Sequence, residues 1–188
     1  MGKLTQKRYL IHSPFFAKTD SELQNAWAEM EKVQQAGKAR AIGVSNYSQS
    51  HLEATLQTAT IRPTINQLEH HPYLQHGDLI PFFHQQQGIR TASYSPLTPI
   101  FRAAGGPVDA KLAELAAKYK VTEGEILLRW SVDRGDVAVT TSSKESRLRE
   151  FLRILDFQLT AAEVDAISQL GRERHYRVFF RQQHGEEE

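Results

Sequence analysis

The sequence predicts an α/β fold in which about five parallel strands with flanking helices form part of a parallel barrel. Short apolar runs alternate along the chain with helical patterns of ten or more residues, which is typical of a parallel sheet. The first run, Tyr9–Ile11, stands close to the start and is followed at once by His12. The chain has 188 residues, whereas a closed eight-unit barrel has about 250. We therefore expect an incomplete (β/α)8 barrel that begins partway through the series.

The first strand–helix unit combines a strand at Arg8–Ile11 with a well-marked helix. Thr19–Glu22 has the spacing of a capping box, in which a threonine and a glutamate satisfy the first free backbone amides. Apolar residues then recur at helical spacing, and Gly37 ends the run. These apolar residues are Leu23, Trp27, Met30 and Val33.

The next three units follow the same pattern. We expect strands at Ala41–Val44, Thr64–Leu68 and Arg90–Tyr94, because each is a short run that fits a buried strand. The second strand is followed by a helix that carries Leu52, Leu56 and Ala59. The third is followed by a helix near Asp78–Gln87.

The later part of the chain holds longer helices and one more strand. Asp109–Tyr119 is predicted to be helical, and Thr122–Glu125 is a second capping box. We expect the fifth strand at Val137–Thr140, followed by a helix through Leu148, Phe151 and Leu155. A last helix begins at a third capping box, Thr160–Glu163, and ends in front of Gly171.

Composition narrows the class of protein. Of the residues 40% are hydrophobic and 24% are charged, which suits one globular domain. The net charge of +1 predicts neither a nucleic-acid nor a membrane partner. The chain has no cysteine, which excludes disulfides and thiolate metal sites. With no long apolar run, we expect a soluble cytoplasmic protein.

Polar side chains stand where the predicted strands end, which is where a parallel fold places its ligand. They are His12, Ser45, Asn46, Gln67, Glu69, Tyr94, Ser95 and Ser142. Ser45 and Ser142 are equally well explained as helix caps. Asn46 and Gln67 favour a ligand that carries an amide, because a buried carboxamide needs partners.

Three further residue types leave alternatives open. His12 fits a general acid, an oxyanion donor, a metal ligand or a histidine that is merely hydrogen-bonded within the fold. Adjacent His70 and His71 point to opposite sides of an extended segment, which disfavours a metal site. Arg147 near a helix start suits a phosphate group, although a surface arginine is the simpler reading. Tyr94 fits either stacking on a flat ring or core packing.

Several segments, in this order, resemble the aldo-keto reductases, and the stretch at Asp156–Thr160 is most like the fungal members. The segments are Leu10–Pro14 (LIHSP), Gly37–Tyr47 (GKARAIGVSNY), Asn66–Tyr73 (NQLEHHPY), Tyr94–Leu97 (YSPL), Leu128–Trp130 (LRW) and Val139–Glu150 (VTTSSKESRLRE). The resemblance covers about residues 9–181. It implies an incomplete TIM (β/α)8 barrel that begins at the fourth barrel strand. We expect residues 1–188 to form a single partial domain with a frayed tail at 182–188.

The resemblance implies NADPH as cofactor and a small aldehyde or ketone as substrate. His12 is similar to the catalytic histidine that orients the substrate carbonyl. Ser45, Asn46 and Gln67 resemble the groups that hold the nicotinamide carboxamide, and Tyr94 resembles the tyrosine that stacks on the nicotinamide ring.

The same resemblance assigns the phosphate end of the cofactor. Ser95 and Leu97 fall in the loop beside the pyrophosphate. Ser142 and Arg147 look like the site of the adenosine 2′-phosphate, and Glu150 matches a position near the adenine.

The catalytic tyrosine, lysine and aspartate of the family belong to its first three barrel strands, and none is expected here. Three hypotheses follow: an NADPH-dependent carbonyl reductase with His12 as the acid, a non-redox lyase, isomerase or cyclase that uses His12 and Glu69, or a non-catalytic fragment. The unpaired sheet edges leave three alternatives: a homo-oligomer covers them, the tail and the long helices fold across them, or the protein is unstable alone.

Overall fold

The structure, a computed structural model, describes residues 6–184. The chain forms two compact units. The first runs to Leu68 and includes Gly77–Thr91, and the second comprises Glu69–His76 and continues from Ala92. Of the predicted frayed tail, residues 182–184 belong to the short helix α9 (Arg181–His184), and 185–188 lie outside the described residues. The single domain over 1–188 stays a prediction.

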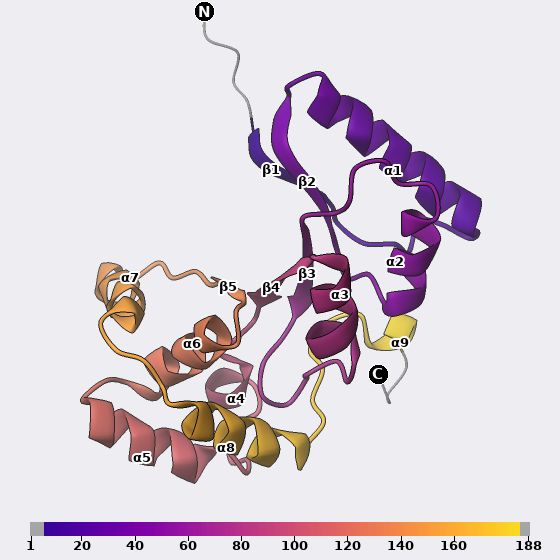
Figure 1. The fold of residues 1–188 in the computed structure, drawn as a ribbon. Coiled ribbons are helices and arrows are strands. Elements are labelled where there is room, and N and C mark those ends of the chain that lie inside the picture. Colours follow the sequence, from indigo (N-terminus) through magenta and orange to yellow (C-terminus); the bar gives the residue numbers. More distant parts are fainter. Residues whose placement is uncertain (1–5, 185–188) are drawn as a thin grey trace, which may run out of the picture. The chain divides into compact units, whose positions relative to one another are not determined.

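Each of the predicted strands is present within residues 6–184, and the strands follow one another in the sheet in their sequence order (Figure 1). β1 (Gln6–Ile11) pairs in parallel with β2 (Ala39–Ser45), and β2 pairs in parallel with β3 (Ile65–Glu69). β4 (Arg90–Tyr94) pairs in parallel with β5 (Val137–Val139). The predicted α/β class with five parallel strands is confirmed.

The first unit packs two helices around a tryptophan. Helix α1 (Asp20–Gln35) begins behind Thr19, whose hydroxyl accepts the N–H of Glu22. The Glu22 carboxylate accepts the N–H of Lys18, so only the threonine half of the predicted capping box is formed. Trp27 of α1 is only 1% exposed, and its indole Nε1–H donates to the carbonyl of Ile61 over 2.9 Å. Helix α2 (Gln49–Leu56) packs against α1 (Figure 1). The core around Trp27 includes Leu23, Met30, Ile42, Val44 and Leu52.

The Glu31 carboxylate of α1 anchors Thr60 and Ile61, which precede β3. Its buried carboxylate accepts the Thr60 N–H and the Ile61 N–H, both over 2.7 Å, and the Thr60 hydroxyl over 2.9 Å. We expect Glu31→Gln to lower the free energy of unfolding by about 2 kcal/mol, because an amide replaces one acceptor oxygen by a donor. Glu29→Gln on the same helix removes only an exposed ion pair with Lys32 and should cost less than about 0.5 kcal/mol. Urea denaturation measures both; equal losses would contradict the anchoring role.

The helix predicted near Asp78–Gln87 has a different form. A π-helical turn, η1 (Leu79–His84), precedes the three-residue helix α3 (Gln85–Gln87). Pro81 lies in the first turn of this segment, where its missing N–H costs no intrahelical hydrogen bond. The Phe83 N–H reaches back five residues to the carbonyl of Asp78 over 3.3 Å.

The second unit is built largely from helices, with α5 (Asp109–Tyr119), α6 (Glu123–Asp133) and α8 (Ala161–Arg172) packed together (Figure 1). The capping boxes predicted at the starts of α6 and α8 are both present. Trp130 of α6 is fully buried, and its indole N–H donates to the Ser168 hydroxyl over 3.0 Å. The core of this unit includes Leu112, Leu115, Ile126, Leu127 and Ile167.

Two predicted boundaries in this unit were wrong. The fifth strand ends at Val139, one residue early. Helix α8 continues through Gly171 to Arg172. A Cβ on Gly171 would lie 2.2 Å from the carbonyl oxygen of Pro72, so this glycine permits close backbone approach and does not end the helix.

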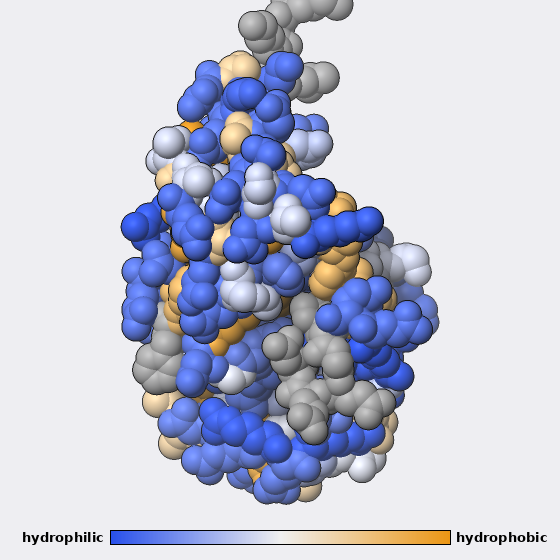
Figure 2. Space-filling model, turned by 90° about the vertical axis from the view of Figure 1, so that its right-hand side faces the viewer, coloured by the Kyte–Doolittle hydropathy of each residue, from blue (hydrophilic) through white to orange (hydrophobic). Residues whose placement is uncertain are grey.

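The remaining helical segments are short. They are α4 (Thr98–Phe101), α7 (Glu145–Leu152) and the 3-10 turn η2 (Arg153–Leu155). Hydrophilic residues prevail on the face drawn in Figure 2. None of the helices in the described part of the chain is long and apolar enough to span a bilayer.

Candidate functional site at the strand ends

In the first unit, hydrogen bonds connect the four predicted residues, of which three stand at the ends of β1 and β2 and the fourth, Gln67, lies in the middle of β3. The Ser45 hydroxyl donates to the backbone carbonyl of Gln67 over 2.7 Å. The Asn46 amide nitrogen donates to the backbone carbonyl of His12 over 3.0 Å and to the Ser45 oxygen over 3.1 Å. His12, Ser45, Asn46 and Gln67 therefore lie together, as the parallel topology predicted.

Ser45 does not cap a helix, and Asn46 has an unusual backbone conformation. Ser48, not Ser45, caps helix α2, so the cap interpretation of Ser45 was wrong. Asn46 has a φ of 61°, a left-handed conformation that asparagine tolerates better than most residues. Strained backbone of this kind gathers at ligand sites. The expected contacts of these side chains with a cofactor stay a prediction.

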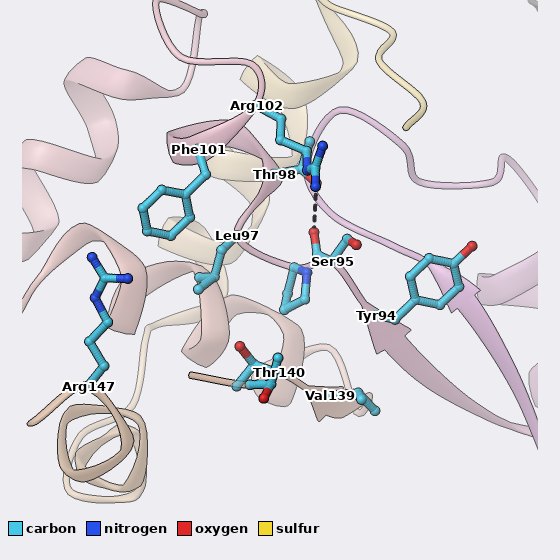
Figure 3. A pocket seen from close by; sticks show the side chains of 11 residues that line it. Tyr94, Ser95, Leu97, Thr98, Phe101, Arg102, Val139, Thr140 and Arg147 are labelled. Carbon is cyan, nitrogen blue, oxygen red and sulfur yellow. Dashed lines mark hydrogen bonds between the residues drawn. The ribbon is translucent and has the colours of Figure 1, made fainter. Parts of the chain in front are cut away.

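In the second unit, residues at the ends of β4 and β5 line an open hollow of about 470 Å³, which we call the β4–β5 hollow. The predicted residues Tyr94, Ser95, Leu97 and Arg147 all line it (Figure 3). Its other lining residues are Pro96, Thr98, Phe101, Arg102, Val139, Thr140 and Thr141. The volume lies in the range of small-molecule sites.

Ser95 follows β4 in the same left-handed backbone conformation in which Asn46 follows β2. It directly follows the strand and has a φ of 54°. Its carbonyl accepts the Thr98 N–H over 3.1 Å and the Thr98 hydroxyl over 2.9 Å. These bonds turn the chain sharply into α4 and place the loop residues in the wall of the β4–β5 hollow.

The charge of the β4–β5 hollow is positive. Arg102 and Arg147 line it, and its lining, drawn from the described residues, contains no aspartate or glutamate. The Arg147 guanidinium lies 5.5 Å from the centre of the Phe101 ring. Guanidinium groups and hydroxyls in one hollow suit the phosphate groups of a nucleotide.

Two predicted residues, Ser142 and Glu150, are not among the residues that line the β4–β5 hollow. The Ser142 oxygen accepts the N–H of Lys144 over 3.0 Å and so closes the turn in front of α7. Glu150 lies in α7 and is partly buried. Lys144 stands at the N-cap of α7 without a side-chain cap bond, so the first amides of this helix add to the positive local potential. The predicted roles of Ser142 and Glu150 stay predictions.

Glu69 is the predicted proton-transfer residue of the lyase hypothesis, but its carboxylate holds the C-terminal segment. It is 1% exposed and accepts the N–H groups of Val178 and Phe179, each over 2.9 Å. His71 Nε2 lies 3.1 Å from the same carboxylate. Glu69 thus has an anchoring role that the sequence did not reveal, and the lyase hypothesis is not favoured.

His70 joins a second buried network. Its Nδ1 lies 2.6 Å from Asp136 Oδ2, and the Ser93 hydroxyl donates to the same oxygen over 2.6 Å. His70 and His71 thus serve different carboxylates. No group of three potential metal ligands occurs among residues 6–184.

The Glu69–His71 pair makes the stability of the second unit depend on pH. Burial raises the pKa of the Glu69 carboxyl, but hydrogen bonds from His71, Phe179 and Val178 outweigh burial, so the pKa lies below its usual value. For the His71 imidazole, burial lowers the pKa, and the neighbouring Glu69 carboxylate offsets only part of this lowering. Groups with lowered pKa stabilise the folded state above their unfolded pKa and lose that contribution in acid.

We therefore expect the free energy of unfolding to fall as the pH is lowered below about 7, first through His71 and then, below about pH 4.3, through Glu69. Urea denaturation at a series of pH values measures this. In Glu69→Gln the slope below about pH 4.5 should become shallower. A stability that rises toward acid would contradict the assigned directions.

A family model and several relatives of known name match this chain. A family model described as "Aldo/keto reductase family" matches residues 5–172. A Saccharomyces cerevisiae protein, "NADPH-dependent alpha-keto amide reductase", is 40% identical over 172 residues, which cover 88% of this chain and 55% of the relative. A Schizosaccharomyces pombe protein, "NAD/NADP-dependent indole-3-acetaldehyde reductase", is 38% identical over 176 residues, covering 92% and 62%. The chain thus spans a little over half the length of these relatives.

Solved structures show the same likeness. A Bombyx mori aldo-keto reductase in complex with NADP superposes with a TM-score of 0.83 at 33% identity, covering 95% of this chain and 61% of that one. An aldo/keto reductase from Brucella melitensis has a TM-score of 0.78 at 30% identity, covering 89% and 62%. The predicted resemblance is confirmed.

Proposed function

The chain belongs to the aldo/keto reductase family, and on that basis we propose that it binds NADPH and reduces the carbonyl group of a small aldehyde or ketone. Relatives named for NADPH-dependent and NAD/NADP-dependent reduction support the proposal. So does the solved relative that holds NADP.

The observation that carries the proposal is the β4–β5 hollow. It combines the guanidinium groups of Arg102 and Arg147 with hydroxyl side chains and without a carboxylate among its lining residues. A dinucleotide phosphate is strongly anionic, and charge-assisted hydrogen bonds from guanidinium groups would hold it. We assign the pyrophosphate to the loop at Ser95 and Leu97. The adenosine 2′-phosphate is assigned to Ser142 and Arg147, with the adenine near Glu150.

The nicotinamide end is assigned to the strand-end residues. Tyr94 would stack on the nicotinamide ring, and the polar groups at Ser45, Asn46 and Gln67 would hold its carboxamide. Burial raises the pKa of the Tyr94 hydroxyl, which makes Tyr94 a poor proton donor and leaves the acid role to His12. NADPH, when bound, supplies the hydride, and His12 orients the carbonyl oxygen and donates the proton.

The direct test measures binding and turnover separately. NADPH should quench the tryptophan fluorescence saturably, and an α-keto amide should then be reduced with loss of NADPH absorbance. His12→Gln should bind NADPH with unchanged affinity but lose at least about 100-fold in kcat. Absence of saturable binding would refute the proposal, and undiminished turnover in His12→Gln would remove His12 as the acid.

We also propose that the chain forms a homo-oligomer. β1 and β5 stand at the two ends of the strand order, and unpaired strand edges favour association. Leu148, Leu152 and Leu155 of the α7–η2 region are 45%, 70% and 71% exposed. Light scattering over a range of concentrations tests this, and a monomer throughout would contradict it. A fungal type and a cytoplasmic location stay predictions.

A further inference from the structure

Three leucines of the α7–η2 region form an exposed apolar stripe. Leu148, Leu152 and Leu155 are 45%, 70% and 71% exposed. Successive members are four and three residues apart, so they share one face of the helix. We call these three residues the leucine stripe. Large apolar side chains that gather on an exposed face indicate an interaction surface.

The other face of this region is fixed to the second unit. Helix α7 lies next to α6 (Figure 1). Ile154 of η2 is buried, and its carbonyl accepts the Arg129 guanidinium of α6 over 2.8 Å. The Arg153 Nε–H donates to the Glu125 carboxylate of α6 over 3.0 Å. These contacts hold η2 against α6 and leave the leucine stripe on the outer side, so a partner can cover the stripe without a rearrangement of the helix.

The leucine stripe and the β4–β5 hollow use different side chains of the same helix. Arg147 of α7 lines the hollow, and the three leucines are not among the lining residues. Glu150 of α7 is partly buried, whereas the leucines are exposed. A partner on the leucine stripe therefore needs none of the residues that are assigned to the cofactor.

The spacing of the leucine stripe suits a second copy of the same helix. Intervals of four and three residues are those of a coiled-coil seam, in which each side chain packs between side chains of the facing helix. A surface that pairs with itself about a two-fold axis is the usual basis of a homodimer. The charges beside the seam decide in which direction the two helices run.

Those charges favour the antiparallel direction. Arg149 and Asp156 occupy the same flanking heptad position one heptad apart, and Lys144 stands on the opposite flank. All three are exposed. In an antiparallel pair like flanks face each other, which places Arg149 opposite Asp156 of the partner subunit on both sides of the axis. A parallel pair would place Lys144 beside Arg149 of the partner subunit, and these like charges would repel.

We propose that the leucine stripe is a homodimer interface in which the α7–η2 regions of two copies pack antiparallel, with Arg149 opposite Asp156 of the partner subunit. This interface rests on the proposed homo-oligomer and commits it to one surface in place of the strand edges. Burial of the leucines of both copies removes apolar area from water. The exposed ion pairs contribute direction more than affinity. A seam this short gives a reversible dimer.

Sedimentation velocity of the full chain at about 1–500 µM measures the dimer dissociation constant without cofactor. Leu152→Glu should raise this constant at least about tenfold, because dimerisation would bury two carboxylates in the seam. Phe16→Glu changes a side chain of the first unit that is 52% exposed and should leave the constant unchanged. Far-UV circular dichroism confirms that both variants keep their helices.

The outcomes separate this interface from the broader proposals. A monomer over the whole concentration range would overturn both the interface and the proposed homo-oligomer. A dimer whose dissociation constant is unchanged in Leu152→Glu would overturn the interface alone and assign the assembly to another surface. Neither result depends on NADPH, so the proposed reductase function is tested separately.

Charge reversal tests the antiparallel direction. Arg149→Glu and Asp156→Arg should each raise the dissociation constant at least about threefold, because like charges then face each other across the axis. The double variant should return to within about twofold of the unaltered chain. It still lacks the Arg149–Glu145 pair within the chain, so its recovery reports the contact between the copies. Losses that add up in the double variant would overturn the antiparallel pairing.

Discussion

Asp136→Ala should lower the free energy of unfolding by about 3–5 kcal/mol. Asp136 Oδ2 lies 2.6 Å from both the Nδ1 of His70 and the hydroxyl of Ser93, and both of these residues are 0% exposed. Truncating the aspartate leaves two buried polar groups without their acceptor, and an unsatisfied buried group costs its full desolvation. Urea denaturation followed by tryptophan fluorescence measures the loss, since Trp130 lies in the same unit and its ring is 5.2 Å from that of His70.

The control for Asp136 is Asp156, an aspartate whose side chain is exposed. Asp156→Ala removes an exposed carboxylate from the same unit and should change the free energy of unfolding by less than about 0.5 kcal/mol. Asp136→Asn keeps an acceptor oxygen and should recover part of the loss. Equal stability of Asp136→Ala and Asp156→Ala would show that the buried network contributes nothing.

Gly171→Ala should destabilise the second unit by about 3 kcal/mol, although alanine is the better helix former. The added Cβ would lie 2.2 Å from the carbonyl oxygen of Pro72 and 2.7 Å from its carbonyl carbon. Backbone atoms cannot move aside as the end of a flexible side chain can, so α8 must shift away from the Pro72 segment. The intrinsic helix preference of up to about 1 kcal/mol in favour of alanine is overcome.

Gly124 provides the matched control for Gly171. It lies in helix α6 of the same unit, and a Cβ there would meet its nearest atom, of Ile100, at 3.6 Å. Gly124→Ala should therefore leave the urea midpoint unchanged or raise it slightly. A midpoint for Gly171→Ala as high as that of Gly124→Ala would show that α8 does not need the close approach to Pro72.

Local signals in the sequence predicted most of the fold. The fourth strand and the helix at Asp109–Tyr119 have the expected bounds, because their apolar period and flanking turns depend only on neighbours in the chain. The capping box at Thr160–Glu163 marked the start of α8 correctly. Its end was misjudged because Gly171 was interpreted as a helix stop. Only the distant Pro72 explains a glycine inside that helix.

Long-range pairs could not be predicted from a single sequence. Asp136 meets His70 across 66 positions, and Glu69 meets Val178 across 109. Neither pair has a local pattern. The strand-end residues were predictable because a parallel topology brings strand ends to one edge. Glu69 was predicted as a site residue for its position, and its anchoring role required the path of the C-terminal segment.

The central claim is that the β4–β5 hollow binds the phosphate groups of NADPH, with Arg147 at the 2′-phosphate. Calorimetric dissociation constants for NADPH and NADH test it most directly. The unaltered chain should bind NADPH at least about tenfold more tightly than NADH, and Arg147→Gln should abolish that difference while leaving NADH affinity unchanged. Arg149→Gln on the same helix removes only an exposed pair with Glu145 and should preserve it. An undiminished NADPH preference in Arg147→Gln would contradict the claim.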